Sequence, residues 1–317
     1  MTAGTPAAPP SPGRGSGAPL RLAFVGQQTY FSACALGDER ADVATAFLDF
    51  RKDGDFAPVR AGLDAFAPDV VVAFRPEHVP AGALHDLPAL TLGFLTEPLP
   101  RLAGGGAAHA DLERRLHELR GVDPRNFDRV VSFDPLIAAT AHEVVPVWRS
   151  LPLPVADRFY RPVEPMRPDP RMLFVGRSTP HREEILRSLK HHHDLLHVAH
   201  GVDGDELQRL LQEFQVGINL HNEPYPSFEN RVCLHLAAGH LVLTEQLSPT
   251  HGLEPGIDYL EHMWEEVAYG LRQAPRTWDR VRLRGRRKAE QFRASRVWPR
   301  VVADLRADVA AFGSPRS

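Results

Sequence analysis

The chain has 317 residues, enough for two domains of ordinary size that each bury a core. Its formal net charge of −3 and pI near 6.6 give no chain-wide attraction for nucleic acid, so we expect no nucleic-acid partner. Two cysteines, Cys34 and Cys233, are too few for a disulfide scaffold or a cysteine-based zinc site, and they favour a cytoplasmic protein.

The first half of the chain predicts an α/β domain. Residues 1–19 are rich in Pro, Gly and Ala without the apolar stretch of a signal peptide, which predicts a disordered tail. Over 20–153, short apolar runs alternate with amphipathic ones, as in parallel strands joined by helices. The expected strands are 21–26, 44–50, 69–74, 89–95 and 129–133, and the expected helices are 30–37, 58–67, 107–120 and 135–142.

A proline-rich passage separates this half from a second one. Six prolines fall within 150–170, a density that excludes a helix and predicts an extended connector over 154–170. The alternation then restarts over 171–295, and a last segment, 296–317, holds a helix and tail. The expected strands are 171–176, 194–200, 216–221 and 241–245, and the expected helices are 181–190, 203–213, 228–238, 262–273 and 276–311. We therefore predict two doubly wound, Rossmann-like α/β domains that face a cleft.

Polar, turn-prone sequence follows most of the predicted strands. In open parallel sheets, ligands bind beyond the carboxyl ends of the strands, so the site is expected in the cleft. The first-domain candidates, on the acceptor side, are Gln27, Gln28, Thr29, Tyr30, Arg75, Glu77, His78 and Glu97. The second-domain candidates, on the donor side, are Gly176, Arg177, Arg182, His221, Asn222, Glu229, Asn230, Arg231, Thr244 and Glu245.

The sequence FVGRSTPHR predicts a phosphate site at the start of the second domain. Its glycine turn lets backbone N–H groups approach a phosphate, the following helix N-terminus adds positive potential, and Arg177 and Arg182 can clamp anionic oxygens. The alternative is an ordinary strand-to-helix turn with two solvated arginines. The position at a strand end favours the phosphate site.

The sequence HNEPYPSFENR predicts a polar loop that faces the cleft. Pro224 and Pro226 exclude regular structure, and Ser227 is expected to cap a helix whose first turn holds Glu229 and Asn230. Side chains of this kind hold the hydroxyls of a sugar or a ribose. Capping and a local salt bridge between Glu229 and Arg231 form the purely structural alternative.

Three other features are assigned to ordinary structure. The histidines at 191–193, 197 and 200 are interpreted as solvated or satisfied side chains, so no metal site is expected. The Asp-Gly-Asp sequences at 53–55 and 203–205 are interpreted as turns. The ten basic residues within 276–300 predict a solvated helix face, with peripheral contact to an anionic membrane as the minor alternative.

The second half resembles the two-domain (GT-B) glycosyltransferases, in particular the group 1, spore-maturation (CgeB-like) branch. The resemblance covers about 171–295 and rests on LFVGR with Arg182 five residues later, on PSFENRVCLHLAAGHLVLTE, and on GLEPGIDYLEH at 252–262. It implies a metal-independent glycosyltransferase of the hexosyltransferase type that needs no cofactor. Its donor would be a nucleotide-diphosphate sugar, and its acceptor a glycan, lipid, protein or small metabolite.

The same resemblance implies roles for individual residues. Arg177 and Arg182 match the basic pair that neutralises the donor diphosphate, and Glu229 and Arg231 match a Phe-Glu-x-Arg pattern. The last helix, around 297–311, would return to the first domain. Leu234 departs from the family, because many relatives carry there a Glu that holds the donor ribose. Either Glu229 replaces it, or donor recognition differs, or catalysis is lost.

The stereochemical outcome of the transfer, inversion or retention, decides whether a general base is needed. Inversion requires a general base that faces the acceptor hydroxyl, for which Glu97, His78 and Glu77 are candidates, with Glu97 preferred. Glu229 is the candidate catalytic residue of the second domain. Retention requires no base at the same place. A sugar-nucleotide epimerase and a catalytically inactive binding module are the rival functions.

Overall fold

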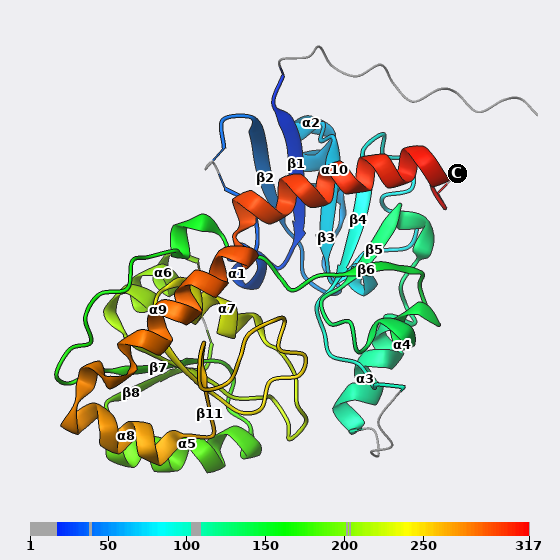
Figure 1. Cartoon of the computed structure of the whole chain (residues 1–317). Helices are drawn as coiled ribbons and strands as arrows, with labels where there is room; N and C mark the ends of the chain where they lie inside the picture. The colour runs from blue at the N-terminus through cyan, green and yellow to red at the C-terminus, as the bar shows by residue number, and fades with distance from the viewer. Residues whose placement is uncertain (1–17, 38–39, 103–108, 201, 203, 317) are drawn as a thin grey trace, which may run out of the picture.

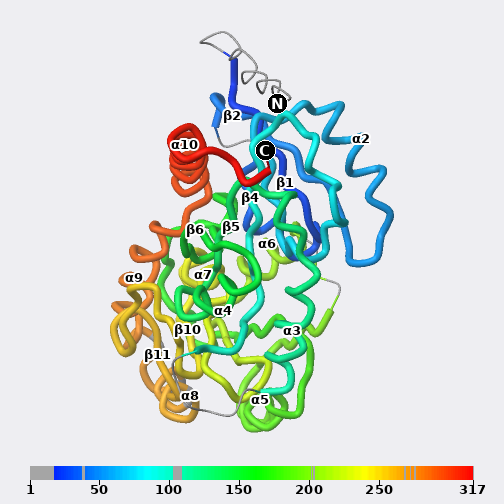
Figure 2. The backbone as a smooth tube through the Cα atoms, turned by 90° about the vertical axis from the view of Figure 1, so that its right-hand side faces the viewer, coloured from blue at the N-terminus to red at the C-terminus, as the bar shows by residue number. Residues whose placement is uncertain are grey.

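The computed structural model describes residues 18–37, 40–102, 109–200, 202 and 204–316, so most of the predicted tail lies outside the described residues. The chain forms two α/β domains, each built around its own parallel sheet (Figure 1). Turned by 90°, the tube trace shows one domain above the other (Figure 2). The predicted fold class is confirmed.

The first domain has a six-stranded parallel sheet. Its strand order is β2-β1-β3-β4-β5-β6. All five residues of β3 are buried, as expected for a strand in a parallel sheet covered on both faces. Its strands are β1 (Leu20–Gly26), β2 (Val43–Asp49), β3 (Val70–Phe74), β4 (Leu90–Leu95), β5 (Arg129–Ser132) and β6 (Val147–Ser150), and its helices are α1 (Gln28–Phe31), α2 (Ala57–Phe66), α3 (Ala110–Leu119) and α4 (Ala138–His142).

The second domain has a five-stranded parallel sheet. Its strand order is β11-β10-β9-β7-β8. The predicted 276–311 segment is divided into two α-helices by a 3₁₀ turn, Ala289–Phe292. Its strands are β7 (Met172–Val175), β8 (Leu195–Val198), β9 (Val216–Asn219), β10 (Leu241–Thr244) and β11 (Leu260–Glu261), and its helices are α5 (Pro180–His192), α6 (Gly204–Glu213), α7 (Asn230–Ala237), α8 (Trp264–Gln273) and α9 (Asp279–Lys288).

The last helix, α10 (Ala294–Phe312), returns to the first domain and lies across its sheet (Figure 1). Trp298 is fully buried there, with ring centroids 5.2 Å from Phe24, 6.2 Å from Phe74 and 6.0 Å from Phe94. Its indole N–H also donates to the carbonyl oxygen of Cys34 at 2.9 Å. The indole therefore anchors α10 to the first domain, as the predicted fold requires.

The proline-rich connector crosses between the domains beside the start of α10. The Val155 N–H donates to Phe292 O, and the Ala294 N–H donates to Val155 O, each at 2.8 Å. Asp157 adds an ion pair with Arg293 at 3.0 Å and accepts a hydrogen bond from Ser295. The two passages of the chain between the domains are thus bonded to each other.

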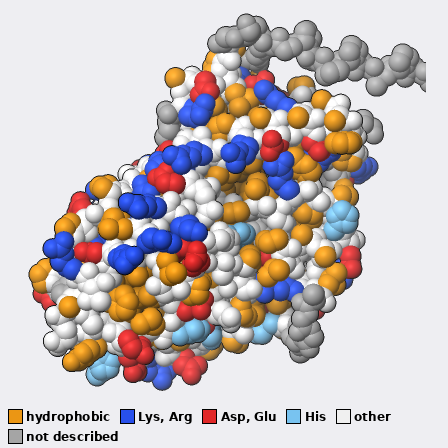
Figure 3. All heavy atoms as spheres, viewed as in Figure 1, with side chains coloured by type: hydrophobic (Ala, Val, Ile, Leu, Met, Phe, Trp, Pro, Cys, Tyr) orange, Lys and Arg blue, Asp and Glu red, His pale blue; other side chains and the backbone are white. Residues whose placement is uncertain are grey.

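The basic segment 276–300 lies along α9 and α10, where Lys and Arg side chains gather in a band (Figure 3). The predicted solvated face describes only part of it. Arg282 is 2% exposed and donates to the carbonyl oxygens of Gly239 and Glu164. Arg286 and Arg293 form ion pairs with Glu290. Within the described residues, no helix combines the length and the hydropathy that crossing a bilayer demands.

Replacing Trp298 with Ala should lower the free energy of unfolding of the first domain by about 3–5 kcal/mol, because it leaves a large cavity among three Phe rings. Urea unfolding followed by circular dichroism measures the change. Phe312→Ala is the control: Phe312 is on the same helix and 81% exposed, so its loss should change stability by less than about 0.5 kcal/mol. Equal effects of the two substitutions would contradict the anchoring role of Trp298.

Candidate functional site

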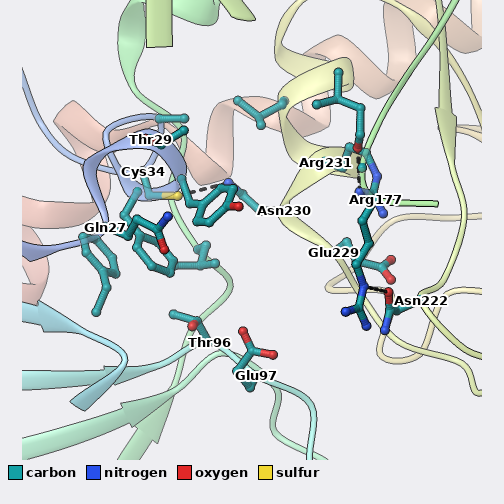
Figure 4. Close-up of a pocket in the computed structure, with 18 of the residues that line it drawn as sticks. Gln27, Thr29, Cys34, Thr96, Glu97, Arg177, Asn222, Glu229, Asn230 and Arg231 are labelled. Carbon is teal, nitrogen blue, oxygen red and sulfur yellow. Dashed lines mark hydrogen bonds between the residues drawn. The ribbon is translucent and has the colours of Figure 1, made fainter. Parts of the chain in front are cut away.

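A cavity of about 540 Å³ lies between the two domains, at the carboxyl ends of strands from both sheets. Figure 4 shows its two walls, with Gln27, Thr29, Thr96 and Glu97 on the first-domain side and Arg177, Asn222, Glu229 and Arg231 on the second-domain side. The predicted residues that line it are Gln27, Thr29, Tyr30, Arg75, His78, Glu97, Gly176, Arg177, Arg182, Asn222, Glu229, Asn230 and Arg231. The structure therefore brings most of the predicted candidates together.

The turn after β7 makes room for two guanidinium groups. A Cβ atom at Gly176 would lie 2.8 Å from Nη1 of Arg231 and 3.3 Å from Nη1 of Arg182. Thr179 caps α5, because its hydroxyl accepts a hydrogen bond from the Arg182 N–H. Glycine at 176 and the cap at 179 together explain how Arg182, from the first turn of α5, reaches the cavity wall.

Arg182 is buried and Arg231 is half-buried, and both are held by uncharged groups. Arg182 donates to the carbonyl oxygens of Arg177, Leu220 and His221 at 2.9–3.2 Å. Arg231 donates to Val175 O, Leu220 O and the Asn219 side chain at 2.8–3.1 Å. Both guanidinium groups also lie over the ring of Phe174, at 5.3 and 5.0 Å.

No carboxylate among the described residues forms a salt bridge with either of these arginines. Burial and the positive charges of Arg231 and Arg177 lower the pKa of Arg182 to about 9, although Glu229 and Glu245 act in the opposite direction. Cations that lack a direct carboxylate partner are costly to bury, so this wall favours an incoming anion. Arg177 is exposed beside them and donates to the Asn222 side chain at 2.8 Å (Figure 4).

Glu229 differs from its predicted setting. The predicted cap, Ser227, is wrong: Glu229 is the N-cap residue of α7, in an extended backbone conformation and without a side-chain capping bond. Its carboxylate instead lies 3.2 Å from Nδ1 of His221 and accepts from the Ser227 hydroxyl at 3.0 Å. The salt bridge weighed for Glu229 is therefore made with His221 and not with Arg231.

The His221–Glu229 pair is charged. Burial alone raises the pKa of Glu229, but His221, Arg231 and Arg182 more than offset this and lower it to about 2. Burial lowers the pKa of His221, but Glu229 outweighs it and raises the pKa overall. His221 Nε2 donates to Gln246 O at 2.8 Å, so both ring nitrogens have partners. An ionised Glu229 is better suited to accept hydrogen bonds from hydroxyl groups than to act as a general acid or base.

Five predicted residues lie outside the cavity lining because their polar groups serve the fold. His221 holds Glu229 from behind. Glu245 accepts from the His221 N–H and contacts His181 Nε2, and the Thr244 hydroxyl bonds to Glu245 O. In the first domain, Gln28 is exposed and its backbone N–H donates to the Asp49 carboxylate. Glu77 forms an ion pair with Arg75 at 2.5 Å.

The first-domain wall carries a network of alternating charges. Arg75, in a left-handed backbone conformation with φ 59°, donates to Glu77, Glu97 and Glu118. Glu97 also pairs with Arg115 of α3, so each of its oxygens faces a guanidinium group. Arg75 contacts Nε2 of His78 at 3.2 Å, and burial with this positive neighbour lowers the pKa of His78. Cations and carboxylates nearly balance here, unlike on the opposite wall.

Several lining residues were not predicted. Among them are Lys52, Arg115 and His235, whereas Thr96 and Tyr225 lie in strand-end segments that the strand-end rule selects. Tyr225 donates to Asp111 of α3 at 2.9 Å, and the Asn230 amide donates to Cys34 Sγ at 3.1 Å, so both connect the two domains. Buried polar atoms of Thr96, Asn222 and Asn230 have no hydrogen-bond partner within the described structure. Such atoms are rare in folded proteins, and all three belong to residues that line the cavity.

A metal site was not expected. In the described part of the chain, no group of three or more His, Cys, Asp and Glu side chains is placed to hold a metal ion.

Glu229→Gln should destabilise the protein by about 2 kcal/mol near pH 5.5, because it removes the charge that His221 faces. Glu229 stabilises the fold above its ordinary pKa of 4.5, and His221 does so below its ordinary value of 6.5. The difference between wild type and variant is therefore largest between about pH 4.5 and 6.5 and declines as His221 deprotonates at higher pH.

Urea unfolding at pH 5.5 and pH 9 measures this dependence. Glu184→Gln, at an exposed position of α5, is the control with the same change of charge and should show neither the loss nor the pH trend. A Glu229→Gln effect that is equal at both pH values would contradict the charged pair.

Comparisons with known proteins identify the fold through similar solved structures. No protein-family model matches the chain, and no curated protein matches it significantly in sequence. HepE of Anabaena, solved in complex with UDP-glucose, is similar in structure with a TM-score of 0.55 at 12% identity, over 91% of this chain and 100% of that one. Sucrose-phosphate synthase of Thermosynechococcus elongatus has a TM-score of 0.56 at 12% identity, over 92% and 100%. The chain therefore has the two-domain GT-B fold of glycosyltransferases.

Proposed function

We propose that the protein is a metal-independent glycosyltransferase that moves a sugar from a nucleotide-diphosphate sugar to an acceptor. The observation that carries the proposal is the cluster of Arg177, Arg182 and Arg231 in the second-domain wall, which has no carboxylate salt-bridge partner in the described structure. A diphosphate would offer these three guanidinium groups anionic oxygens with which to pair.

The comparisons and the sequence support the same function. HepE, which shares the fold, was solved with UDP, with UDP and glucose, and with UDP-glucose. Within the fold, the motifs around Arg177 and Glu229 favour the CgeB-like branch and transfer of a hexose. We also propose that the protein acts in the cytoplasm and that its first domain binds the acceptor.

The geometry suits departure of a nucleoside diphosphate. Negative charge develops on the leaving diphosphate during transfer, and guanidinium groups fixed in advance stabilise it without reorganisation. Arg182 and Arg231 are fixed by backbone carbonyl groups, whereas the exposed Arg177 is held only through Asn222. Glu229 and Asn230 follow on the same wall and offer oxygens to the hydroxyl groups of the donor.

For an inverting reaction, we assign the base to His78 rather than to the preferred Glu97. Both oxygens of Glu97 already pair with guanidinium groups, one with Arg75 and one with Arg115, so an acceptor hydroxyl would have to displace one of these ion pairs to reach the carboxylate. His78 is neutral near pH 7, because its pKa is lowered by burial and by Arg75. A neutral imidazole can accept the proton of an acceptor hydroxyl once that hydroxyl replaces the 3.2 Å contact with Arg75.

Arg177→Ala should weaken binding of nucleoside diphosphate about 10- to 100-fold, the loss expected for hydrogen bonds to a charged group. Calorimetric titration with a panel of nucleoside diphosphates measures it. Arg187→Ala is the matched control, because Arg187 is exposed farther along α5 and lies outside the cavity lining. Equal affinity of wild type and Arg177→Ala for every nucleotide in the panel would refute the proposed donor site.

Turnover with nucleotide sugars separates the rival functions. Release of nucleoside diphosphate that depends on an added acceptor supports transfer. An isomerised sugar nucleotide would show an epimerase, and tight binding without turnover would show an inactive binding module.

His78→Asn should lower the rate of transfer by about 100-fold or more while nucleotide affinity stays unchanged, because the base acts only on the acceptor. Single-turnover rates and nucleotide titrations on the same preparation give both quantities. Glu97→Gln is the comparison. A larger loss of rate in Glu97→Gln with unchanged binding would move the base to Glu97.

A further inference from the structure

Two buried histidines of the second domain form a hydrogen-bonded chain beside the cavity. His235 of α7 and His240, just beyond its end, are 1% and 2% exposed. Their Nδ1 atoms lie 3.0 Å apart, and Nε2 of His240 lies 2.9 Å from the carbonyl oxygen of Leu211 on α6. His235 lines the cavity, and its Nε2 atom has no partner among the described residues.

This chain of contacts fixes the tautomer of both rings. A carbonyl oxygen only accepts, so His240 Nε2 carries a proton. Burial lowers the pKa of His240 to about 4 and that of His235 well below its ordinary value, so both rings are neutral with one N–H each. His240 Nδ1 is then an acceptor, and His235 Nδ1 must donate to it. The remaining nitrogen, His235 Nε2, carries a lone pair and no proton.

The surroundings of His235 are apolar. Gly217 of β9 accommodates the ring, since a Cβ atom there would lie 2.2 Å from the ring carbon Cγ. The nonpolar lining residues of this domain come from β7, β8, α6, α7 and the segments before α6 and α7, and they are Val175, Val198, Ala199, Val202, Leu207, Leu211, Phe228 and Leu234. A single acceptor with such neighbours contrasts with the arginine cluster of the same domain.

The acceptor and the arginine cluster are held by one helix. Arg231 and His235 are four residues apart on α7, so they share a face and are separated by about 6 Å along the axis. Both line the cavity. A ligand that is anionic at one end and carries a flat ring with an N–H group at the other matches this arrangement. A nucleoside diphosphate is such a ligand.

We propose that His235 Nε2 accepts a hydrogen bond from a ring N–H of the donor's nucleobase and thereby selects the base. This inference rests on the proposed function and specifies its donor. Uracil carries N–H at N3 and guanine at N1, whereas cytosine N3 and adenine N1 are lone pairs that would face the lone pair of His235. A polar site left unpaired in this way rejects a ligand strongly, so uridine or guanosine diphosphate sugars are the expected donors.

Titration of the wild-type protein with UDP and with 3-methyl-UDP, which lacks only the N3 proton and adds a methyl group, tests the assignment for a uracil donor. We expect 3-methyl-UDP to bind about 10- to 100-fold more weakly. GDP and 1-methyl-GDP form the corresponding pair for a guanine donor, and CDP and ADP should bind weakly. His235→Phe keeps the ring on Gly217 without the lone pair, and it should remove most of the difference between each nucleotide and its methylated form.

The outcomes distinguish this inference from the proposed function. Nucleotides that bind in an Arg177-dependent way, but equally well with and without the methyl group, would overturn the role of His235 and leave the transferase proposal standing. Tightest binding of CDP or ADP would overturn that role in the same way. If no nucleotide binds the wild-type protein, both proposals fail. Because the methylated ligands are tested on the wild-type chain, instability of the variant does not affect the result.

Discussion

The second-domain wall depends on two guanidinium groups, one buried and one half-buried, that have no carboxylate salt-bridge partner among the described residues. Arg182 and Arg231 donate to carbonyl groups that follow β7 and β9, so the same side chains that make the wall positive also hold two strand ends together. Gly176 is required because any side chain there would displace them, and the ring of Phe174 supports both. Stability and anion binding therefore cannot be varied independently at these positions.

The two walls of the cavity use charge in opposite ways. In the first domain, every guanidinium of the Arg75–Glu97–Arg115 network faces a carboxylate, which gives a rigid and nearly neutral surface. In the second domain, Glu229 forms its salt bridge with His221, so Arg177, Arg182 and Arg231 have no direct carboxylate partner in the described structure. The proposed reaction fits this division, with the anionic donor on the second-domain wall and the acceptor hydroxyl on the first-domain wall.

Much of the fold was predictable because buried parallel strands leave apolar runs in the sequence. The edge strands β6 and β11 were missed, since β6 is only half-buried and β11 has two residues. The strand-end rule located Arg177, Arg182 and Glu229 in the cavity wall. It did not reveal Arg115, because its place in the wall depends on an ion pair with Glu97, far from it in the chain. It did not reveal the N-cap position of Glu229, because that depends on the direction of the side chain.

The paired crossings at Val155 and Phe292–Ala294 have a mechanical consequence. Because the two passages of chain that join the domains are bonded to each other, they form one pivot instead of two separate tethers. Opening of the cleft about this pivot would have to break the hydrogen bond between Tyr225 and Asp111. It would also have to break the bonds that Arg101 of the first domain donates to Ser248 and Pro226 of the second, so these distant contacts act as a latch opposite the pivot.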